Sequence, residues 1–277
     1  DPGRAQEIQK TSRCSNRGRQ SRKGEYRATA AHQYIGPMYK AWRTLWNSLP
    51  STCQVCGTWS TDPVCPECTR RFQAARSRCT RCAGQVPEGV ELCGTCLTRE
   101  TPTELNACVA AVDYAYPWDT LIARFKFREE PGWAAPFARQ MLRAPHAEAL
   151  LAACDLITPV PLAPGRLAER GYNQAWELVK ALQRRSELPT PPQALPDALV
   201  RLIETPDQHS LNREQRLHNL QGVFSAHPLH ASRLPGTHVL LVDDVTTTGA
   251  TLQAAARALK QAGAQAVSAL VFARTPR

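Results

Sequence analysis

One run near the C-terminus, residues 238–251, constrains the fold more than any other part of the sequence. It reads HVLLVDDVTTTGAT. Four consecutive apolar residues, 239–242, predict a strand buried on both faces, as in a parallel sheet. Asp243 and Asp244 end that strand, and threonines with one glycine lead into an alanine-rich helix predicted over 252–263. This order predicts an α/β domain whose ligands bind at the carboxyl ends of its strands.

The loop after the two acids has the composition of a phosphate-binding turn. The backbone N–H groups that can converge on an anion are those of Thr246, Thr247, Thr248, Gly249, Ala250 and Thr251. The helix dipole favours negative charge at this end, and a glycine lets the main chain approach a ligand closely. Asp243 and Asp244 beside the loop can accept hydrogen bonds from sugar hydroxyls and help to hold Mg²⁺. A phosphorylated sugar fits this arrangement best.

The run resembles the 5-phosphoribosyl-1-pyrophosphate (PRPP) motif of type I phosphoribosyltransferases. That motif has four apolar residues, two acids, one apolar residue, two variable residues, then Thr, Gly, any residue and Thr, and every position matches. Two alternatives remain: a buried strand followed by a helix-capping threonine, and a response-regulator phosphoacceptor. The phosphoacceptor also begins with apolar residues and Asp-Asp, but it lies near the start of its domain and lacks the Thr-Thr-Thr-Gly. A Walker loop would need Gly-Lys-Ser/Thr, which does not follow the strand.

Eight of the eleven cysteines fall in four C-x-x-C pairs. The pairs are Cys53/Cys56, Cys65/Cys68, Cys79/Cys82 and Cys93/Cys96. Two facing knuckles make a tetrahedral site of four thiolates, so the spacing predicts two successive structural zinc ribbons, 53–68 and 79–96. An interleaved cross-brace is the alternative pairing. Metal should supply most of the folding energy of this module, and the pattern without an export signal indicates a reducing cytoplasm.

Chain length and net charge exclude only a few classes of function. A chain of 277 residues has room for one medium domain and a smaller module. No run of about 18 apolar residues occurs, so no membrane span is predicted. Residues 1–37 hold eight Lys/Arg against three Asp/Glu, which accounts for half of the net charge of +10. Because thiolate zinc sites are negative, the remainder is nearly neutral, and its charge is weak evidence for nucleic-acid binding.

Three regions are predicted along the chain. Residues 1–37 are interpreted as a disordered basic tail, with a nucleic-acid-binding arm as the alternative. Met38 is a candidate natural start, in which case residues 1–37 precede the native chain. Residues 38–100 are predicted to form the double zinc ribbon with a short leading helix, and residues 101–277 a phosphoribosyltransferase-like domain.

Apolar periodicity predicts alternating strands and helices after residue 101, which favours a doubly wound parallel sheet with flanking helices. Strands are expected over 107–114, 155–160, 198–203, 239–242 (the central strand) and 266–273, the last closing the sheet. Helices are expected over 118–127, 133–143, 146–153, 172–185, 212–220 and 252–263, with a proline-rich loop over 188–196.

Further segments extend the resemblance. They are residues 121–127 (LIARFKF), 159–166 (PVPLAPGR), 170–174 (RGYNQ), and 208–211 with Arg216, Asn219 and Gly222. With the double ribbon in front, their order resembles the ComF family of phosphoribosyltransferase-like proteins, over roughly residues 38–272. That family is associated with natural competence, the uptake of single-stranded DNA; some bacterial members are linked with gluconate utilisation instead.

The resemblance implies roles for individual residues. Residues 246–251 would hold the 5′-phosphate of PRPP, Asp243 and Asp244 would hold the ribose hydroxyls, and Mg²⁺ would bridge ribose and pyrophosphate oxygens. Residues 159–161 up to Arg166 form the candidate pyrophosphate loop, with Arg166 or Arg170 as its cation, and Lys126 could reach the same place. Taken singly, each of these three basic residues is equally a candidate for a surface charge or a helix-end residue.

Three functions follow from these features. The first is a ComF-type cytoplasmic protein that binds PRPP with Mg²⁺ and assists DNA uptake through single-stranded DNA or a partner helicase. The second is a metabolic phosphoribosyltransferase, a pentosyl transferase acting on a small nitrogenous acceptor. The third retains the pocket as a PRPP sensor. The sequence names no acceptor nucleophile and no oligomeric state.

Overall fold

The computed structural model describes residues 51–73, 76–98, 103–202 and 222–276. Contacts divide the chain into two units, Asp1–Leu49 and Pro50–Arg277, and the description below concerns the second. The predictions for residues 1–37, for the short leading helix and for the helix over 212–220 lie outside the described residues.

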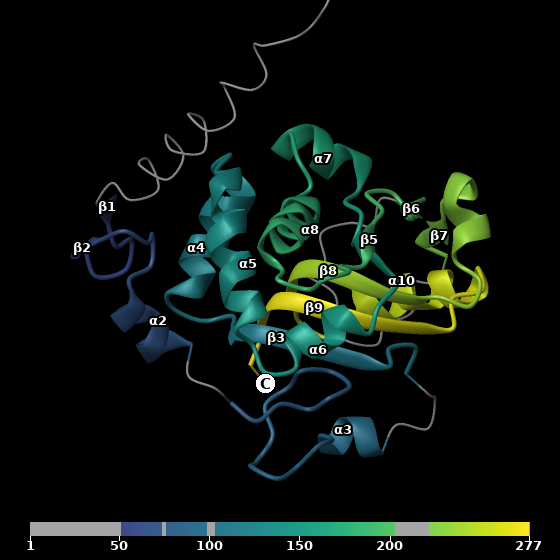
Figure 1. Ribbon diagram of the computed structural model, residues 1–277, viewed down its shortest axis with the longest axis horizontal. Helices are drawn as coiled ribbons and strands as arrows, with labels where there is room; N and C mark the ends of the chain where they lie inside the picture. The colour runs from purple at the N-terminus through teal and green to yellow at the C-terminus, as the bar shows by residue number, and fades with distance from the viewer. Residues whose placement is uncertain (1–50, 74–75, 99–102, 203–221, 277) are drawn as a thin grey trace, which may run out of the picture. The chain divides into compact units, whose positions relative to one another are not determined.

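The main sheet has five parallel strands (Figure 1). In order across the sheet they are β3 (Ala107–Asp113), β9 (Ala266–Arg274), β8 (His238–Thr246), β4 (Leu156–Pro159) and β5 (Gln193–Ala194). β8 is the middle strand, as predicted. β9 lies between β3 and β8, so the last strand does not close the sheet at its edge as expected, and β3 forms that edge instead.

Helices cover both faces of this sheet (Figure 1). The helices of the described domain are α4 (Trp118–Phe127), η1 (Pro131–Trp133), α5 (Ala134–Leu142), α6 (Ala147–Ala152), α7 (Pro164–Arg170), α8 (Gln174–Arg185), η3 (Pro228–Arg233) and α10 (Ala250–Gln261); α7 and η3 bury no residue. Successive residues of β8 alternate between two cores, since side chains along a strand point to opposite faces. Leu240 and Val242 pack with α4, α5 and α8, and Val239 and Leu241 pack with α10. The predicted α/β class, a parallel sheet with flanking helices, is therefore confirmed.

Three local predictions need correction. The proline-rich stretch 188–196 contains β5, which pairs with β4. The strand predicted over 198–203 is β6 (Leu199–Arg201), and it pairs antiparallel with β7 (Phe224–Ala226) outside the main sheet. The candidate pyrophosphate loop gives way after residue 163 to the short helix α7, which begins at a proline suited to a first helical turn.

The helix α8 begins at Gln174 and not at residue 172, because the side chain of Asn173 caps it. The Asn173 Oδ1 accepts hydrogen bonds from the N–H groups of Ala175 (2.9 Å) and Trp176 (3.4 Å). An asparagine in this position satisfies donors that the first helical turn leaves free. Its Nδ2 also donates to the carbonyl of Val160 (3.1 Å), which fixes the helix start against the end of β4.

The cysteine-rich part forms two small units, named here the first ribbon (residues 51–73) and the second ribbon (residues 76–98). The first contains the hairpin of β1 (Ser51–Thr52) and β2 (Trp59–Ser60) and the helix α2 (Pro66–Phe72). The second contains an antiparallel bridge between Arg78 and Gln85 and the helix α3 (Gly94–Leu97). Among the described residues, no helix has the length and apolar character needed to cross a membrane.

Candidate functional site

The two acids point to opposite sides of the sheet from within the middle strand, which continues to Thr246 and does not end at the acids as the sequence predicts. Asp244 is buried, with 3% of its surface exposed, and its Oδ1 lies 2.8 Å from the Nζ of Lys126 on α4. Its Oδ2 is also buried and has no hydrogen-bond partner among the described residues. A buried carboxylate oxygen normally has a partner, so this unpaired atom marks a place suited to a donor or a cation from a ligand.

Asp243 is half-buried on the other side of the strand, and its Oδ1 accepts a hydrogen bond from the N–H of Asp244 (2.8 Å). Burial, followed by the charge of Asp244, raises the pKa of Asp243 to about 7, against the opposing charge of Lys126. A carboxyl group with a pKa near neutrality can accept or release a proton under ordinary conditions.

The threonine loop, residues 246–251, turns at Gly249 into α10. Gly249 adopts the left-handed conformation with φ of 80°, which a residue with a side chain rarely adopts. Among the described residues, none accepts a hydrogen bond from the backbone N–H groups of Thr247, Thr248, Gly249 or Thr251. These donors at a helix start form a set that an anion can bind.

Arg274 is the functional candidate that the sequence reasoning missed. It ends β9 beside Thr246, and only 2% of its surface is exposed. Its Nη1 donates to the carbonyl oxygens of Thr246 (3.3 Å) and Thr247, and its Nε donates to that of Cys82 in the second ribbon (3.1 Å). The available signal was one charge at the end of an otherwise apolar strand, since arginine is rarely fully buried without partners.

The other predicted cations are placed as follows. Lys126 reaches the site and pairs with Asp244. Arg170 ends α7, its guanidinium lies 4.9 Å from the ring centroid of Phe127, and its charge lowers the pKa of Asp243 slightly against the larger effect of burial. Arg166 lies one turn earlier on the same helix, where residues four apart share a face. The roles suggested for these residues stay predictions.

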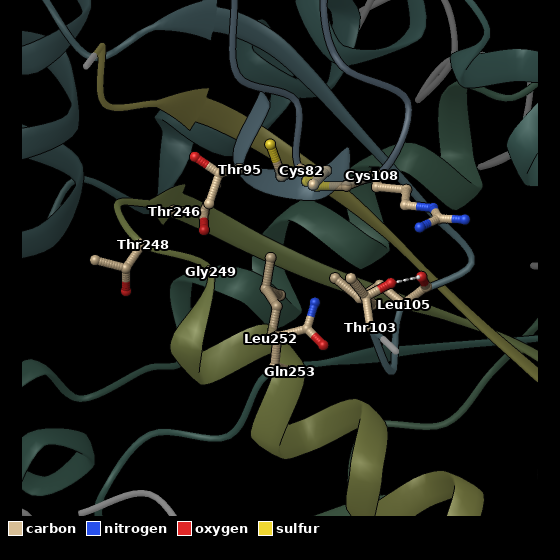
Figure 2. Close-up of a pocket in the computed structure, with 12 residues that line it drawn as sticks. Cys82, Thr95, Thr103, Leu105, Cys108, Thr246, Thr248, Gly249, Leu252 and Gln253 are labelled. Carbon is tan, nitrogen blue, oxygen red and sulfur yellow. Dashed lines mark hydrogen bonds between the residues drawn. The ribbon is translucent and has the colours of Figure 1, made fainter. Parts of the chain in front are cut away.

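A small cavity lies between the threonine loop and the second ribbon (Figure 2). Its walls are Thr246, Thr248, Gly249, Leu252 and Gln253 from the loop and α10, Arg81, Cys82, Thr95 and Cys96 from the ribbon, and Thr103, Leu105 and Cys108 from β3 and the segment before it. Figure 2 shows Cys82 and Thr95 on one side and Gly249 and Leu252 on the other. The second ribbon is thus a direct neighbour of the loop.

The cysteines form two groups whose sulfur atoms lie within 4.8 Å of one another. The groups are Cys53, Cys56, Cys65 and Cys68, and Cys79, Cys82, Cys93 and Cys96. The pairing is therefore sequential, as predicted, and not interleaved. Each group offers four thiolates and could hold a metal in a closed tetrahedral site.

Local hydrogen bonds favour the thiolate form of some cysteines in each group, whereas burial and neighbouring sulfur atoms raise the pKa of Cys68 and Cys96. The Sγ of Cys53 accepts from the N–H of Cys65 (3.3 Å). A hydrogen bond from Thr58 contributes most to lowering the pKa of Cys56 to about 6. Burial works against ionisation of Cys79, but backbone N–H donors lower its pKa to about 7. Because metals bind the thiolate, these donor sets fit the zinc expected from the sequence.

The two knuckles turn in the same way with different residues. The N–H of Gly57 donates to the carbonyl of Cys53 (2.8 Å), and that of Ala83 donates to Cys79 (2.8 Å). Both are left-handed, with φ of 74° and 55°. At the second knuckle the left-handed residue is Ala83, and the glycine that follows it, Gly84, is not left-handed.

Asp197, His227 and His230 form a third group of ligating atoms that the sequence did not suggest. The Nε2 of His230 lies 2.8 Å from the Oδ1 of Asp197, and the Nδ1 of His227 accepts from the N–H of Leu229 (3.2 Å). We interpret this group as a hydrogen-bonded His–Asp pair beside a capped helical turn.

Comparison with known proteins agrees with this architecture. The family model described as "Phosphoribosyl transferase domain" matches residues 203–277. The DNA utilization protein YhgH of Escherichia coli K12 is 31% identical over 239 residues, which cover 82% of this chain and 99% of that protein. The chain belongs to the ComF family.

Two further relatives of this ComF-family protein carry competence names. Competence protein F of Haemophilus influenzae is 29% identical over 214 residues, covering 76% of this chain and 90% of that protein. Competence protein ComFC of Bacillus subtilis is 34% identical over 121 residues, covering 43% of this chain and 45% of that protein.

Proposed function

We propose that this ComF-family protein binds PRPP with Mg²⁺ at the carboxyl edge of the sheet. The buried, unpaired Oδ2 of Asp244 beside the unpaired amides of the threonine loop is the observation that carries the proposal. A phosphorylated sugar with its metal would supply both an anion for the amides and a cation or hydroxyl donor for the carboxylate.

Each element would then have a separate task. The amides of residues 246–251 would bind the 5′-phosphate, and Asp243 and Asp244 would accept hydrogen bonds from the ribose hydroxyls. Lys126 holds one oxygen of Asp244 and leaves the other facing a ligand. Arg170, with Arg166 on the same short helix, would face the pyrophosphate. Mg²⁺ would neutralise part of the phosphate charge, as in related transferases.

We further propose that both cysteine groups hold zinc in a structural role. Four thiolates fill a tetrahedral site and leave no position for a substrate. Retaining eight thiolates requires reducing conditions, which supports a cytoplasmic location. In the cell, the protein would assist the uptake or use of DNA, as the names of its relatives suggest, with single-stranded DNA or a competence helicase as the partner.

One observation favours the alternative of a metabolic phosphoribosyltransferase. The pKa of Asp243, raised to about 7 chiefly by burial, would suit a general base that takes a proton from a nitrogen nucleophile. Release of pyrophosphate from PRPP, screened over bases and amines, would support turnover. Binding without turnover, together with oligonucleotide binding that weakens with salt, would support the DNA-handling role.

Thermal unfolding with PRPP and Mg²⁺ tests the ligand itself. At about 100 times its Kd, a specific ligand should raise the Tm by roughly 5–10 °C. Asp243→Asn and Asp244→Asn should each abolish most of the shift. Asp155→Asn is the matched control, because Asp155 lies at the opposite end of the same sheet, where its Oδ2 accepts from the N–H of His238 (2.8 Å). An equal shift in all four proteins would contradict the site.

A further inference from the structure

Arg274 joins the second ribbon to the threonine loop through hydrogen bonds from a single guanidinium group. One guanidinium donates to the carbonyl of Cys82, a metal-ligand position, and to the carbonyls of Thr246 and Thr247. The side chain is buried, so these bonds are shielded from water and stronger than exposed ones. Sequence places Arg274 far from the cysteines, and the contact exists only in the folded chain.

Holding those two carbonyls also sets the direction of the amides that follow them. In a trans peptide plane, the C=O and the N–H point in opposite directions. With the carbonyls of Thr246 and Thr247 turned toward Arg274, the N–H groups of Thr247 and Thr248 face away from it. These are two of the donors left unpaired in the loop.

The second ribbon is fastened to this edge of the sheet by other contacts as well. The N–H of Cys108 on β3 donates to the carbonyl of Thr80 (2.8 Å). Asp113 at the end of β3 accepts from Arg78 (2.8 Å), and Arg76 lies 3.4 Å from its other oxygen. Cys82, Cys96 and Gly249 line the same cavity, so the second group of cysteines faces the threonine loop (Figure 2).

We infer that Arg274 is a positioning residue through which metal binding in the second ribbon sets the anion-binding shape of the threonine loop. Metal ligation fixes the Cys79–Cys82 knuckle and therefore the Cys82 carbonyl; the knuckle holds Arg274, and Arg274 holds the loop. Loss of the metal should let the knuckle move and should weaken ligand binding, although no metal ligand touches the bound molecule. Residues that hold the binding residues in place affect affinity in this way. The part concerning PRPP rests on the proposed function.

The first ribbon supplies the matched control. Its hydrogen bonds to the domain run to α4 and α5. Trp118 Nε1 donates to the carbonyl of Phe72 (2.9 Å) and Gln73 Nε2 to that of Gln140 (2.8 Å), while Arg124 and Arg139 donate to Gln54 and Asp62. Among the described residues, it makes no hydrogen bond to the threonine loop. Cys65 and Cys93 occupy the same place in their groups, each directly before a helix, and serine is a good residue at such a position.

The experiment compares Cys93→Ser with Cys65→Ser in the full chain. Metal content should show loss of one zinc per chain in both variants. Titration calorimetry with PRPP and Mg²⁺, run well below the melting temperature, should show a Kd raised about tenfold for Cys93→Ser and less than twofold for Cys65→Ser. Hydrogen exchange of the peptide spanning residues 246–251 should rise only in Cys93→Ser.

Substitution of the arginine tests the link directly. Arg274→Gln should raise both the Kd for PRPP and the hydrogen exchange of the loop. Arg274→Lys should raise both by less, because lysine keeps a charged donor but lacks the planar guanidinium that can bond several carbonyls at once. Combining Arg274→Gln with Cys93→Ser should add little, since both break one connection.

Equal effects of the two cysteine variants, or an unchanged loop after zinc loss from the second ribbon, would overturn the coupling. If the wild-type chain does not bind PRPP, the proposed function fails, and the hydrogen-exchange comparison still decides the coupling by itself.

Discussion

The first ribbon places Cys53, Val64, Cys65 and Cys68 in the same hydrophobic core as α4, α5 and α8, whereas Ala83 alone represents the second ribbon in the core on the other face. The second ribbon is attached mainly by polar contacts, at Asp113, Thr80 and Arg274. The same arrangement of cysteine pairs therefore serves two kinds of attachment. Apolar burial gives stability without direction, and hydrogen bonds give direction with little net stability.

Because the two ribbons are attached differently, loss of each metal should have a different effect. Metal in the first ribbon supports a unit whose cysteines are part of the core, so its loss should affect the folding of the whole domain. Metal in the second ribbon supports a unit beside the threonine loop, so its loss should affect the ligand more than the fold. Four predictions test this division, from the largest expected effect to the smallest.

Removal of both metals should have the largest effect. A thiol-modifying reagent with a chelator should release two zinc ions per chain, one from each group of four cysteines. The free energy of unfolding should fall by at least several kcal/mol, because metal binding contributes directly to folding in such modules. Zinc release and circular dichroism measure the two quantities together. Release of a single ion would break the comparison.

Single cysteine variants in the two ribbons should lower the free energy of unfolding by different amounts. Cys65→Ser should destabilise the domain by about 3 kcal/mol and Cys93→Ser by about 1 kcal/mol, because only the first also disturbs the main core. Urea denaturation followed by tryptophan fluorescence measures both. Equal losses would mean that attachment to the core does not distinguish the ribbons.

Asp243 predicts a pH dependence that neither ribbon should alter. Burial and then Asp244 raise its pKa from 3.8 to about 7, so the folded state keeps a proton that the unfolded chain has released. The free energy of unfolding without ligand should therefore fall as the pH rises from about 4 to about 7.

Asp243→Asn should remove this dependence and stabilise the protein at pH 8 by about 1–2 kcal/mol, allowing for the partial exposure of the carboxyl group. Urea denaturation at pH 5 and pH 8 is the measurement. A pH profile that stays the same in Asp243→Asn would show that another group titrates.

Substitution of the acids that attach each ribbon to the domain should change the stability least. Asp113 is mostly buried, its side chain 16% exposed, and bonds to Arg78 and Gln85; Asp62 of the first ribbon is 32% exposed and pairs with Arg139. Asp113→Asn should cost about 1 kcal/mol and Asp62→Asn about 0.3 kcal/mol. Asp113→Asn should also raise hydrogen exchange in the threonine loop, and Asp62→Asn should not.

Most elements of the α/β domain were predictable because their signals are local. The helix over 118–127 and the strands over 107–114 and 266–273 carry clear apolar periodicity, and the structure confirms them within a residue or so. The two-residue strand β5 was missed because its pairing with β4 leaves no pattern in a proline-rich stretch. The pairing of β6 with β7 was missed for a similar reason, since periodicity predicts a strand but not its partner.

By itself, the sequence determined the four C-x-x-C pairs, the order of strand, acids, loop and helix, and membership of an α/β class. Each depends on residues close together in the chain, whose spacing limits the geometry they can adopt. Tertiary structure alone decided that Lys126 pairs with Asp244, that Arg274 joins Cys82 to the threonine loop, and that the ribbons attach differently. Those contacts join distant residues, and only the packing of elements against one another brings them within hydrogen-bonding distance.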